Sequence, residues 1–326
     1  MFYNMSNIMF LMTSMMASMM AISCNSWLIS WIALEINLFF FIPIIYMYNK
    51  FNSESSIKYF LIQVISSMFI LLTINYWTMN KQYFMNIIIN ISLISKLGSV
   101  PLHMWMIQII ESMNWIQFLL MSTWQKLAPM ILMFNFFNNI LMKIFILLNG
   151  MVSAISGMNQ MSMKKLFGFS SINHLSWLML TSMISEQMMM MYFSVYLLTM
   201  TMISYLLFNF NTWMSNMMMN KKKKISLITI SMIFLSMGGM PPFIGFIPKW
   251  ITIQMLMIKN YYFMMMMMLL FSTMNLYYYF RLSYLILILN NLKINYKLKM
   301  TSKIYLYLYM YMNMSLMMFL LINLNF

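Results

Sequence analysis

Residues 238–250 read GGMPPFIGFIPKW and lie inside an apolar run that extends from about residue 225 to 257. Such a run is longer than the roughly 20 residues with which one straight helix crosses a membrane. Proline removes a backbone hydrogen-bond donor, so the glycine and proline pairs predict a helix that is broken within the membrane. Irregular backbone at that depth is tolerated only where protein buries it or where it lines a wet cavity. The stretch therefore indicates a membrane protein with an internal polar region.

Apolar runs of about 20 residues recur along the chain, which is 63% hydrophobic and only 7% charged. Soluble domains carry roughly 25% charged residues, so we predict an all-α, polytopic membrane protein. We expect about eleven transmembrane helices in a single membrane domain of residues 1–326, with discontinuous helices near 96–101 and 238–249. The predicted spans are residues 5–22, 26–48, 57–79, 83–106, 115–137, 140–157, 167–185, 188–210, 225–257, 261–288 and 303–325.

The lysines of the predicted loops gather on one side of the membrane. The odd-numbered loops hold only Lys81, Lys143 and Lys259, whereas the even-numbered loops hold most of the others. The positive-inside rule then places the N-terminus inside and the C-terminus outside. The 52 methionines and the many residues with A- and T-rich codons are typical of a mitochondrial genome with a second methionine codon. We therefore expect a multi-pass protein of the mitochondrial inner membrane, with its N-terminus in the matrix and its C-terminus in the intermembrane space.

The net charge of +15 raises the question of a nucleic-acid partner. Loop lysines of a polytopic protein explain this charge better, so we expect no nucleic acid to bind. The run Lys221–Lys224 is interpreted as a topology signal that attracts anionic lipid head groups, such as those of cardiolipin.

Four ionisable residues lie inside predicted spans, namely Glu35, Lys96, Lys126 and Lys249. A charged group at that depth costs at least ~2.5–3.5 kcal/mol, so such residues usually line an ion or proton path. Each lysine lies close to a proline, and burial disfavours the charged form of an amine, which suits a proton carrier. Two alternatives stay open: the lysines extend to the membrane surface, or Glu35 forms a structural ion pair.

The two histidines are further candidates for a proton relay because imidazole titrates near neutral pH. His103 follows Lys96 by seven residues, so both share a face if the helix continues through Pro101. His174 lies in the first part of its predicted span. Structural hydrogen bonding is an equal alternative for each histidine.

The sequence also lacks the patterns of redox cofactors. The single cysteine, Cys24, excludes an internal disulfide and a cysteine-ligated metal cluster. There is no phosphate-binding glycine loop and no dinucleotide fingerprint. We therefore expect the chain to bind no cofactor and no metal.

Several strings occur in the order of a known family. They are Leu34-Glu35-Ile-Asn37, Lys96-Leu-Gly98, Thr123-Trp-Gln-Lys126, Ser170-Ser-Ile-Asn-His174 and the stretch 238–250. In these strings the chain resembles the subunit 2 family of mitochondrial NADH dehydrogenase, antiporter-like membrane subunits of respiratory complex I. The resemblance implies an antiporter-like fold with inverted five-helix repeats and two discontinuous helices.

The resemblance also implies proton translocation coupled to NADH oxidation and ubiquinone reduction. Glu35 and Lys96 would form a coupled pair, and Lys126, His174 and Lys249 would continue the path. NADH, FMN, iron–sulfur clusters and ubiquinone are expected elsewhere in the complex, and the partners would be other membrane-arm subunits. In one departure from many relatives, Ile107-Gln108 replaces Pro-Glu, so no carboxylate role is expected there.

Two other functions remain open from the sequence. A free-standing cation/proton antiporter would need a sodium site with carboxylates, and Glu35 is the only interior carboxylate. A structural scaffold with a vestigial polar axis is the other alternative.

Overall fold

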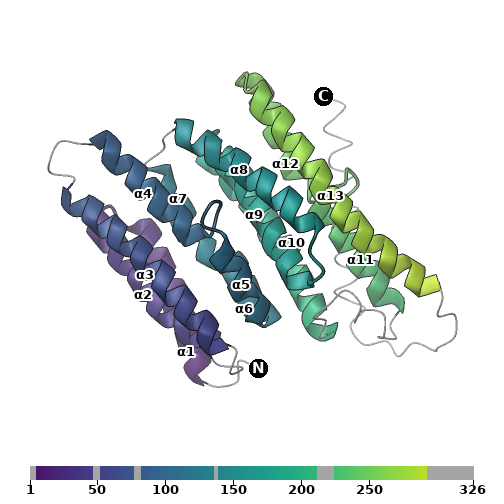
Figure 1. Cartoon of the computed structure of the whole chain (residues 1–326), viewed down its shortest axis with the longest axis horizontal. Coiled ribbons are helices and arrows are strands. Elements are labelled where there is room, and N and C mark those ends of the chain that lie inside the picture. Colours follow the sequence, from purple (N-terminus) through teal and green to yellow (C-terminus); the bar gives the residue numbers. More distant parts are fainter. Residues whose placement is uncertain (1–4, 47–51, 77–81, 136–138, 211–223, 292–326) are drawn as a thin grey trace. The chain divides into compact units, whose positions relative to one another are not determined.

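The computed structural model describes residues 5–46, 52–76, 82–135, 139–210 and 224–291, which are mainly helical (Figure 1). The predicted all-α fold is confirmed for these residues. The helices are α1 (Met5–Ser23), α2 (Trp27–Tyr46), α3 (Asn52–Tyr76), α4 (Gln82–Leu97), α5 (Met104–Ser112), α6 (Trp115–Ser122), α7 (Trp124–Phe134), α8 (Asn139–Met158), α9 (Met163–Ser182), α10 (Glu186–Phe210), α11 (Lys224–Gly238), α12 (Phe246–Ile258) and α13 (Tyr262–Asn291).

Helices that are long and apolar enough to cross a membrane recur throughout the described part of the chain. They are α1, α2, α3, α8, α10 and α13, and shorter apolar helices occur at 85–97 and 246–258. This pattern confirms a polytopic membrane protein. The span predicted at 303–325 and most of the lysine run at 221–224 lie outside the described residues.

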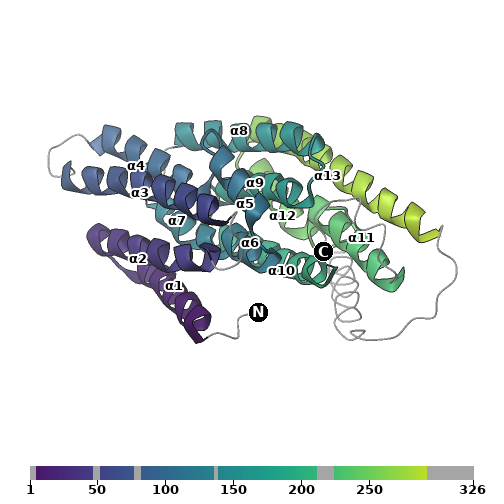
Figure 2. The ribbon, with the colours of Figure 1, turned by 60° about the horizontal axis from the view of Figure 1, so that its bottom comes forward.

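The contacts between Cα atoms divide the chain into two units. Unit 1 consists of residues 1–149 and 167–179, and unit 2 consists of residues 150–166 and 180–326. In unit 1, α3 packs between α2 and α4, and the pairing of α3 with α4 is visible in Figures 1 and 2. In unit 2, α11 and α13 lie side by side in both views. The single membrane domain stays a prediction.

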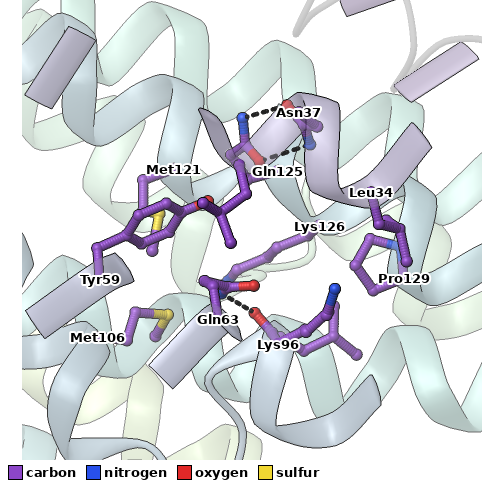
Figure 3. Close-up of a pocket in the computed structure, with 12 residues that line it drawn as sticks. Leu34, Asn37, Tyr59, Gln63, Lys96, Met106, Met121, Gln125, Lys126 and Pro129 are labelled. Carbon is purple, nitrogen blue, oxygen red and sulfur yellow. Dashed lines mark hydrogen bonds between the residues drawn. The ribbon is translucent and has the colours of Figure 1, made fainter. Parts of the chain in front are cut away.

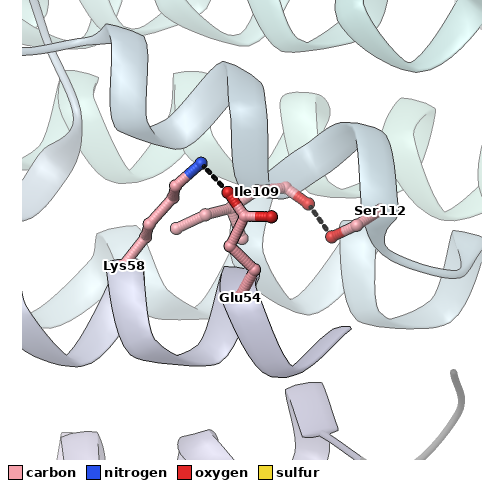
Figure 4. A network of polar contacts seen from close by, with 4 residues as sticks. All are labelled: Glu54, Lys58, Ile109 and Ser112. Carbon is pink, nitrogen blue, oxygen red and sulfur yellow. Dashed lines mark hydrogen bonds and ion pairs between the residues drawn. The ribbon is translucent and has the colours of Figure 1, made fainter. Parts of the chain in front are cut away.

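The N-terminal end of α3 carries an exposed ion pair (Figure 4). The Nζ atom of Lys58 lies 2.6 Å from Oε1 of Glu54, one helical turn earlier. Glu54 lies in the first turn of α3, where the helix dipole stabilises a carboxylate. Such a pair on the surface contributes little to stability, about 0–1 kcal/mol. Because α3 begins at Asn52, it starts earlier than the span predicted at 57–79.

The first break follows α4, which ends in a Schellman motif. The backbone N–H of Gly98 donates to the carbonyl of Ser95 at 3.1 Å, and the N–H of Ser99 donates to the carbonyl of Ile94 at 3.2 Å. Gly98 has a φ of +66°, a left-handed conformation that glycine adopts at little cost. These bonds satisfy carbonyls that the helix end would otherwise leave unpaired.

The discontinuity predicted near residues 96–101 is therefore confirmed. The span predicted at 83–106 consists of α4 and the start of α5, with an irregular segment between them. Pro101 has no N–H, and the N–H of Val100 donates to Oδ1 of Asn149 on α8 at 2.6 Å. A side chain from another helix thus replaces a lost helical bond in the break.

The second break follows α11 and has the same local chemistry. The N–H of Gly239 donates to the carbonyl of Ser236 at 3.1 Å, and the N–H of Met240 donates to the carbonyl of Leu235 at 3.2 Å. Gly239 has a φ of +82°. The discontinuity predicted near 238–249 is confirmed, because α11 ends there and α12 begins at Phe246.

A third interruption was not predicted. The span expected at 115–137 is divided into α6 and α7 at Thr123. The hydroxyl and the N–H of Thr123 both donate to the carbonyl of Leu119, at 2.6 and 3.0 Å. A threonine side chain that competes for a backbone carbonyl distorts a helix. The span at 115–137 was predicted without this interruption, because Thr123 is neither a glycine nor a proline.

Substitution by alanine should lower stability at Gly239 but have little effect at the adjacent Gly238. A Cβ on Gly239 would lie 2.8 Å from Nζ of Lys249 in a left-handed backbone, so Gly239→Ala should destabilise the protein by more than about 1 kcal/mol. A Cβ on Gly238 would meet Leu276 at an ordinary 3.4 Å, so Gly238→Ala is the matched control. Native gels and thermal melts of the assembled protein test this; equal stability of both variants would contradict it.

Candidate functional site

A small polar cavity lies inside unit 1 (Figure 3). Its volume is about 20 Å³, which is enough for one water molecule. Most of its lining comes from α2, α3, α4 and α7, and half of the lining residues are polar. The lining residues are Leu34, Asn37, Leu38, Tyr59, Gln63, Lys96, Leu97, Met106, Met121, Gln125, Lys126 and Pro129.

Lys96 reaches this cavity from the last turn of α4. Its side chain is buried, with 6% exposed, and the break at Gly98 follows it directly. The carbonyl of Lys96 accepts a hydrogen bond of 3.1 Å from Nε2 of Gln63 on α3. The C-terminal end of a helix stabilises a positive charge. The break therefore holds an amine at a buried helix end, beside space for water.

Glu35, the predicted partner of Lys96, lies on α2. Its Oε1 atom is buried and accepts no hydrogen bond from the described residues. Leu34 and Asn37, on either side of Glu35 in α2, line the same cavity as Lys96. Within the described part of the chain, no direct ion pair joins Glu35 to Lys96.

Lys126 is the second amine at the cavity and lies in the first turn of α7. It is 2% exposed, and its Nζ atom donates to the backbone carbonyl of Ser171 on α9 at 3.3 Å. Figure 3 shows Lys96 and Lys126 approaching the cavity from different helices. Tertiary packing thus gathers two predicted carriers around one site.

His174 lies one helical turn after Ser171 on α9 and is buried, with 6% exposed. The carbonyl that accepts the hydrogen bond from Lys126 and the imidazole of His174 thus belong to neighbouring turns of one helix. The place of His174 after Lys126 in a proton path stays a prediction.

His103 lies apart from the cavity lining. It precedes α5, and its Nδ1 atom lies 3.2 Å from the carbonyl oxygen of Pro101. Its ring packs 6.2 Å from that of Phe169. The condition for His103 to share a helix face with Lys96 is not met, because α4 ends at Leu97 and does not continue through Pro101.

Lys249 belongs to unit 2 and lies in the first turns of α12. It is 5% exposed, and its Nζ atom donates to the carbonyl of Gly238 at 3.0 Å. Gly238 is the last residue of α11, so the amine caps the carbonyl end of the broken helix. The absence of a side chain at Gly239 leaves room for this contact.

The side-chain amides of Asn37 and Gln125 also line the cavity and were not among the predicted site residues. Nδ2 of Asn37 donates to Oε1 of Gln125 at 2.8 Å, and Nε2 of Gln125 donates to Oδ1 of Asn37 at 3.1 Å (Figure 3). This reciprocal pair joins α2 to α7. Both amides lie within two residues of Glu35 or Lys126, and an amide in an apolar run was the available signal.

Within the ranges that the structure describes, no three histidine, cysteine, aspartate or glutamate side chains are grouped to hold a metal ion.

Comparisons with known proteins show the family to which the chain belongs. The profile of the NADH:quinone oxidoreductase/Mrp antiporter transmembrane family matches residues 24–275. The NADH-ubiquinone oxidoreductase chain 2 of Anopheles gambiae is 39% identical, over 90% of this chain and 89% of that protein.

Solved structures show the same fold. A chain of respiratory complex I from Thermus thermophilus matches with a TM-score of 0.78 and 18% identity, covering 87% of this chain and 71% of that one. A chain of the Mrp complex from Dietzia sp. matches with a TM-score of 0.72 and 11% identity, covering 84% and 59%. The fold is therefore that of the antiporter-like membrane subunits.

The chain belongs to the NADH:quinone oxidoreductase/Mrp antiporter transmembrane family, among the NADH-ubiquinone oxidoreductase chain 2 proteins.

The amide pair generates a stability prediction. Asn37→Leu leaves the half-buried amide of Gln125 without its partner, which should cost about 1 kcal/mol. Replacing both residues, as Asn37→Leu with Gln125→Met, removes the unpaired group and should recover most of that stability. Thermal melts of the four members of this double-mutant cycle give the coupling. Additive losses would show that the pair contributes nothing as a pair.

Proposed function

We propose that this chain is a membrane subunit of respiratory NADH–ubiquinone oxidoreductase that translocates protons across the inner mitochondrial membrane. NADH oxidation and ubiquinone reduction, with FMN and iron–sulfur clusters, would take place elsewhere in the complex. Family membership supports this assignment. The observation that carries the proton-path part is the cavity at which Lys96 and Lys126 meet.

The relay begins with Glu35 and Lys96. When the charge of this pair changes, the electrostatic potential at the cavity changes with it. A charge that appears within several ångströms is worth a few kcal/mol at an effective dielectric constant of about 20, so it can move a proton onto or off Lys126. A water molecule in the cavity would connect the two amines, because both line a space large enough for one.

From Lys126 the path continues along α9 within unit 1. Lys126 donates a hydrogen bond to the carbonyl of Ser171, one helical turn before His174. The imidazole of His174 is therefore the next group along α9 that could take up a proton. Lys249 is the later carrier. A neutral amine keeps two N–H donors, so Lys249 can stay bonded to the carbonyl of Gly238 in both charge states. His103, beside the first break, completes the set of proposed relay residues.

The remaining assignments concern surroundings and orientation. The partners would be other membrane-arm subunits, with anionic lipid such as cardiolipin near the loop lysines. The excess of lysine in the even-numbered loops supports an N-terminus in the matrix and a C-terminus in the intermembrane space.

Lys126→Met should lower the number of protons pumped per electron while the complex still assembles, because the thioether cannot carry a proton. The measurement is the proton-to-electron ratio of NADH-driven pumping in inner-membrane vesicles, with assembly checked on a native gel. Lys259→Met is the control. Lys259 is exposed, and its Nζ atom donates to the backbone carbonyl of Ile184, just after α9, at 2.9 Å. An unchanged ratio in Lys126→Met would refute the proposed path.

Lys96→Arg tests whether Lys96 must release its proton. Arginine keeps a positive charge beside Glu35 but does not deprotonate in proteins. If Lys96 carries or exchanges a proton, Lys96→Arg should lower the pumping ratio about as much as Lys96→Met. A normal ratio with arginine and a low one with methionine would instead make Lys96 a fixed charge.

A further inference from the structure

The side chain of Asn275 on α13 is buried in unit 2 and has no hydrogen-bond partner among the residues that the structure describes. Asn275 is 1% exposed, and neither Oδ1 nor Nδ2 bonds to any of the described residues. A buried amide left unpaired loses the full free energy of its hydration, and lipid offers no replacement. Buried polar groups of this kind are usually satisfied by an internal water molecule.

Asn275 lies next to the break that holds Lys249. A Cβ on Gly238 would lie 3.5 Å from Cα of Leu276, so the backbone of α13 passes directly beside this glycine. The carbonyl of the same glycine accepts the hydrogen bond from Nζ of Lys249. The packing of α11 on α13 is visible in Figures 1 and 2. Asn275 directly precedes the residue of α13 that packs on Gly238, and the buried amine of Lys249 bonds to the carbonyl of that same glycine.

Two tyrosines extend the polar face of α13 beyond Asn275. Tyr278 and Tyr279 follow it by three and four residues, so all three side chains lie on one side of the helix. Both tyrosines are buried, with 0% and 1% exposed, and their ring centroids are 4.6 Å apart. A tyrosine hydroxyl both donates and accepts a hydrogen bond, which is what passing a proton along a chain requires.

We propose that Asn275 binds a buried water molecule, and that this water transfers protons between Lys249 and the hydroxyls of Tyr278 and Tyr279. The evidence for the water site comes only from the packing of unit 2. Its role in proton transfer rests on the proposed function.

The transfer balances in protons. The ammonium of Lys249 gives one proton to the water, which releases another of its protons to the next hydroxyl and is left unchanged. That hydroxyl passes its own proton to a further water molecule, which carries it onward as hydronium, and Lys249 becomes a neutral amine until an earlier carrier reprotonates it. The amide of Asn275 orients the water throughout and keeps all its protons, so Asn275 is a positioning residue.

The water site is tested first by electron cryo-microscopy of the assembled complex at a resolution that shows ordered water. We expect density within hydrogen-bond distance of the Asn275 amide on the side of Lys249. Density that is absent in the wild type overturns the proposal, whatever the pumping measurements give. Density that is lost in Asn275→Leu, which has a similar volume and no polar atom, supports it.

Proton transfer is tested by the pumping ratio in the same vesicles. Asn275→Leu should lower the ratio to the level of Lys249→Met, and the double variant should show no further loss, because both changes interrupt one step. Asn275→Ser leaves room for water and keeps a hydroxyl, so it should recover most of the ratio, whereas Asn275→Ala should not.

The outcomes separate this inference from the proposed path as a whole. If Lys126→Met lowers the ratio and Asn275→Leu leaves it unchanged, the inference fails and the proposed function stands. If neither variant changes the ratio, proton transfer through Asn275 fails together with the proposed function. Equal losses in Asn275→Ser and Asn275→Ala would make Asn275 a packing residue and would also overturn the inference.

Discussion

The central constraint on this structure is that backbone groups within a membrane must find hydrogen-bond partners inside the protein. The two breaks, after Leu97 and after Gly238, meet it in the same way. Each ends in a Schellman motif with a left-handed glycine. Each also recruits a side chain from elsewhere, Asn149 at the first break and Lys249 at the second. The breaks are stable because every one of these contacts is present.

The same constraint explains why amines are located where they are. A helix that ends inside the protein presents carbonyl oxygens and the negative end of its dipole, and both stabilise a cation that lipid would reject. Lys96 occupies the end of α4, and Lys249 caps α11. Lys126 bonds instead to a carbonyl of the neighbouring helix α9. Lys126 and Lys249 thus each donate to a backbone carbonyl, an arrangement that tolerates both the charged and the neutral form of the amine.

Sequence patterns located both discontinuous helices because glycine and proline act locally, within a few residues of where they stand. They missed the interruption at Thr123, since a threonine distorts a helix only when its hydroxyl finds a backbone carbonyl. They also missed the pairing of Asn37 with Gln125, which lie on different helices. His103 and Lys96 would share a helix face only on a continuous helix, and α4 ends at Leu97.

The sequence by itself determined the membrane class, most of the helices, the positions of the two breaks and three buried lysines, Lys96, Lys126 and Lys249, but not the burial of Lys164. These follow from hydrophobicity, from local backbone chemistry and from the cost of a charge in lipid. Only the tertiary structure decided that Lys96 and Lys126 share one cavity and that Asn275 lies beside the break that holds Lys249. Such neighbourhoods depend on how separate helices pack, and periodicity along one helix carries no information about which residue of another helix it meets.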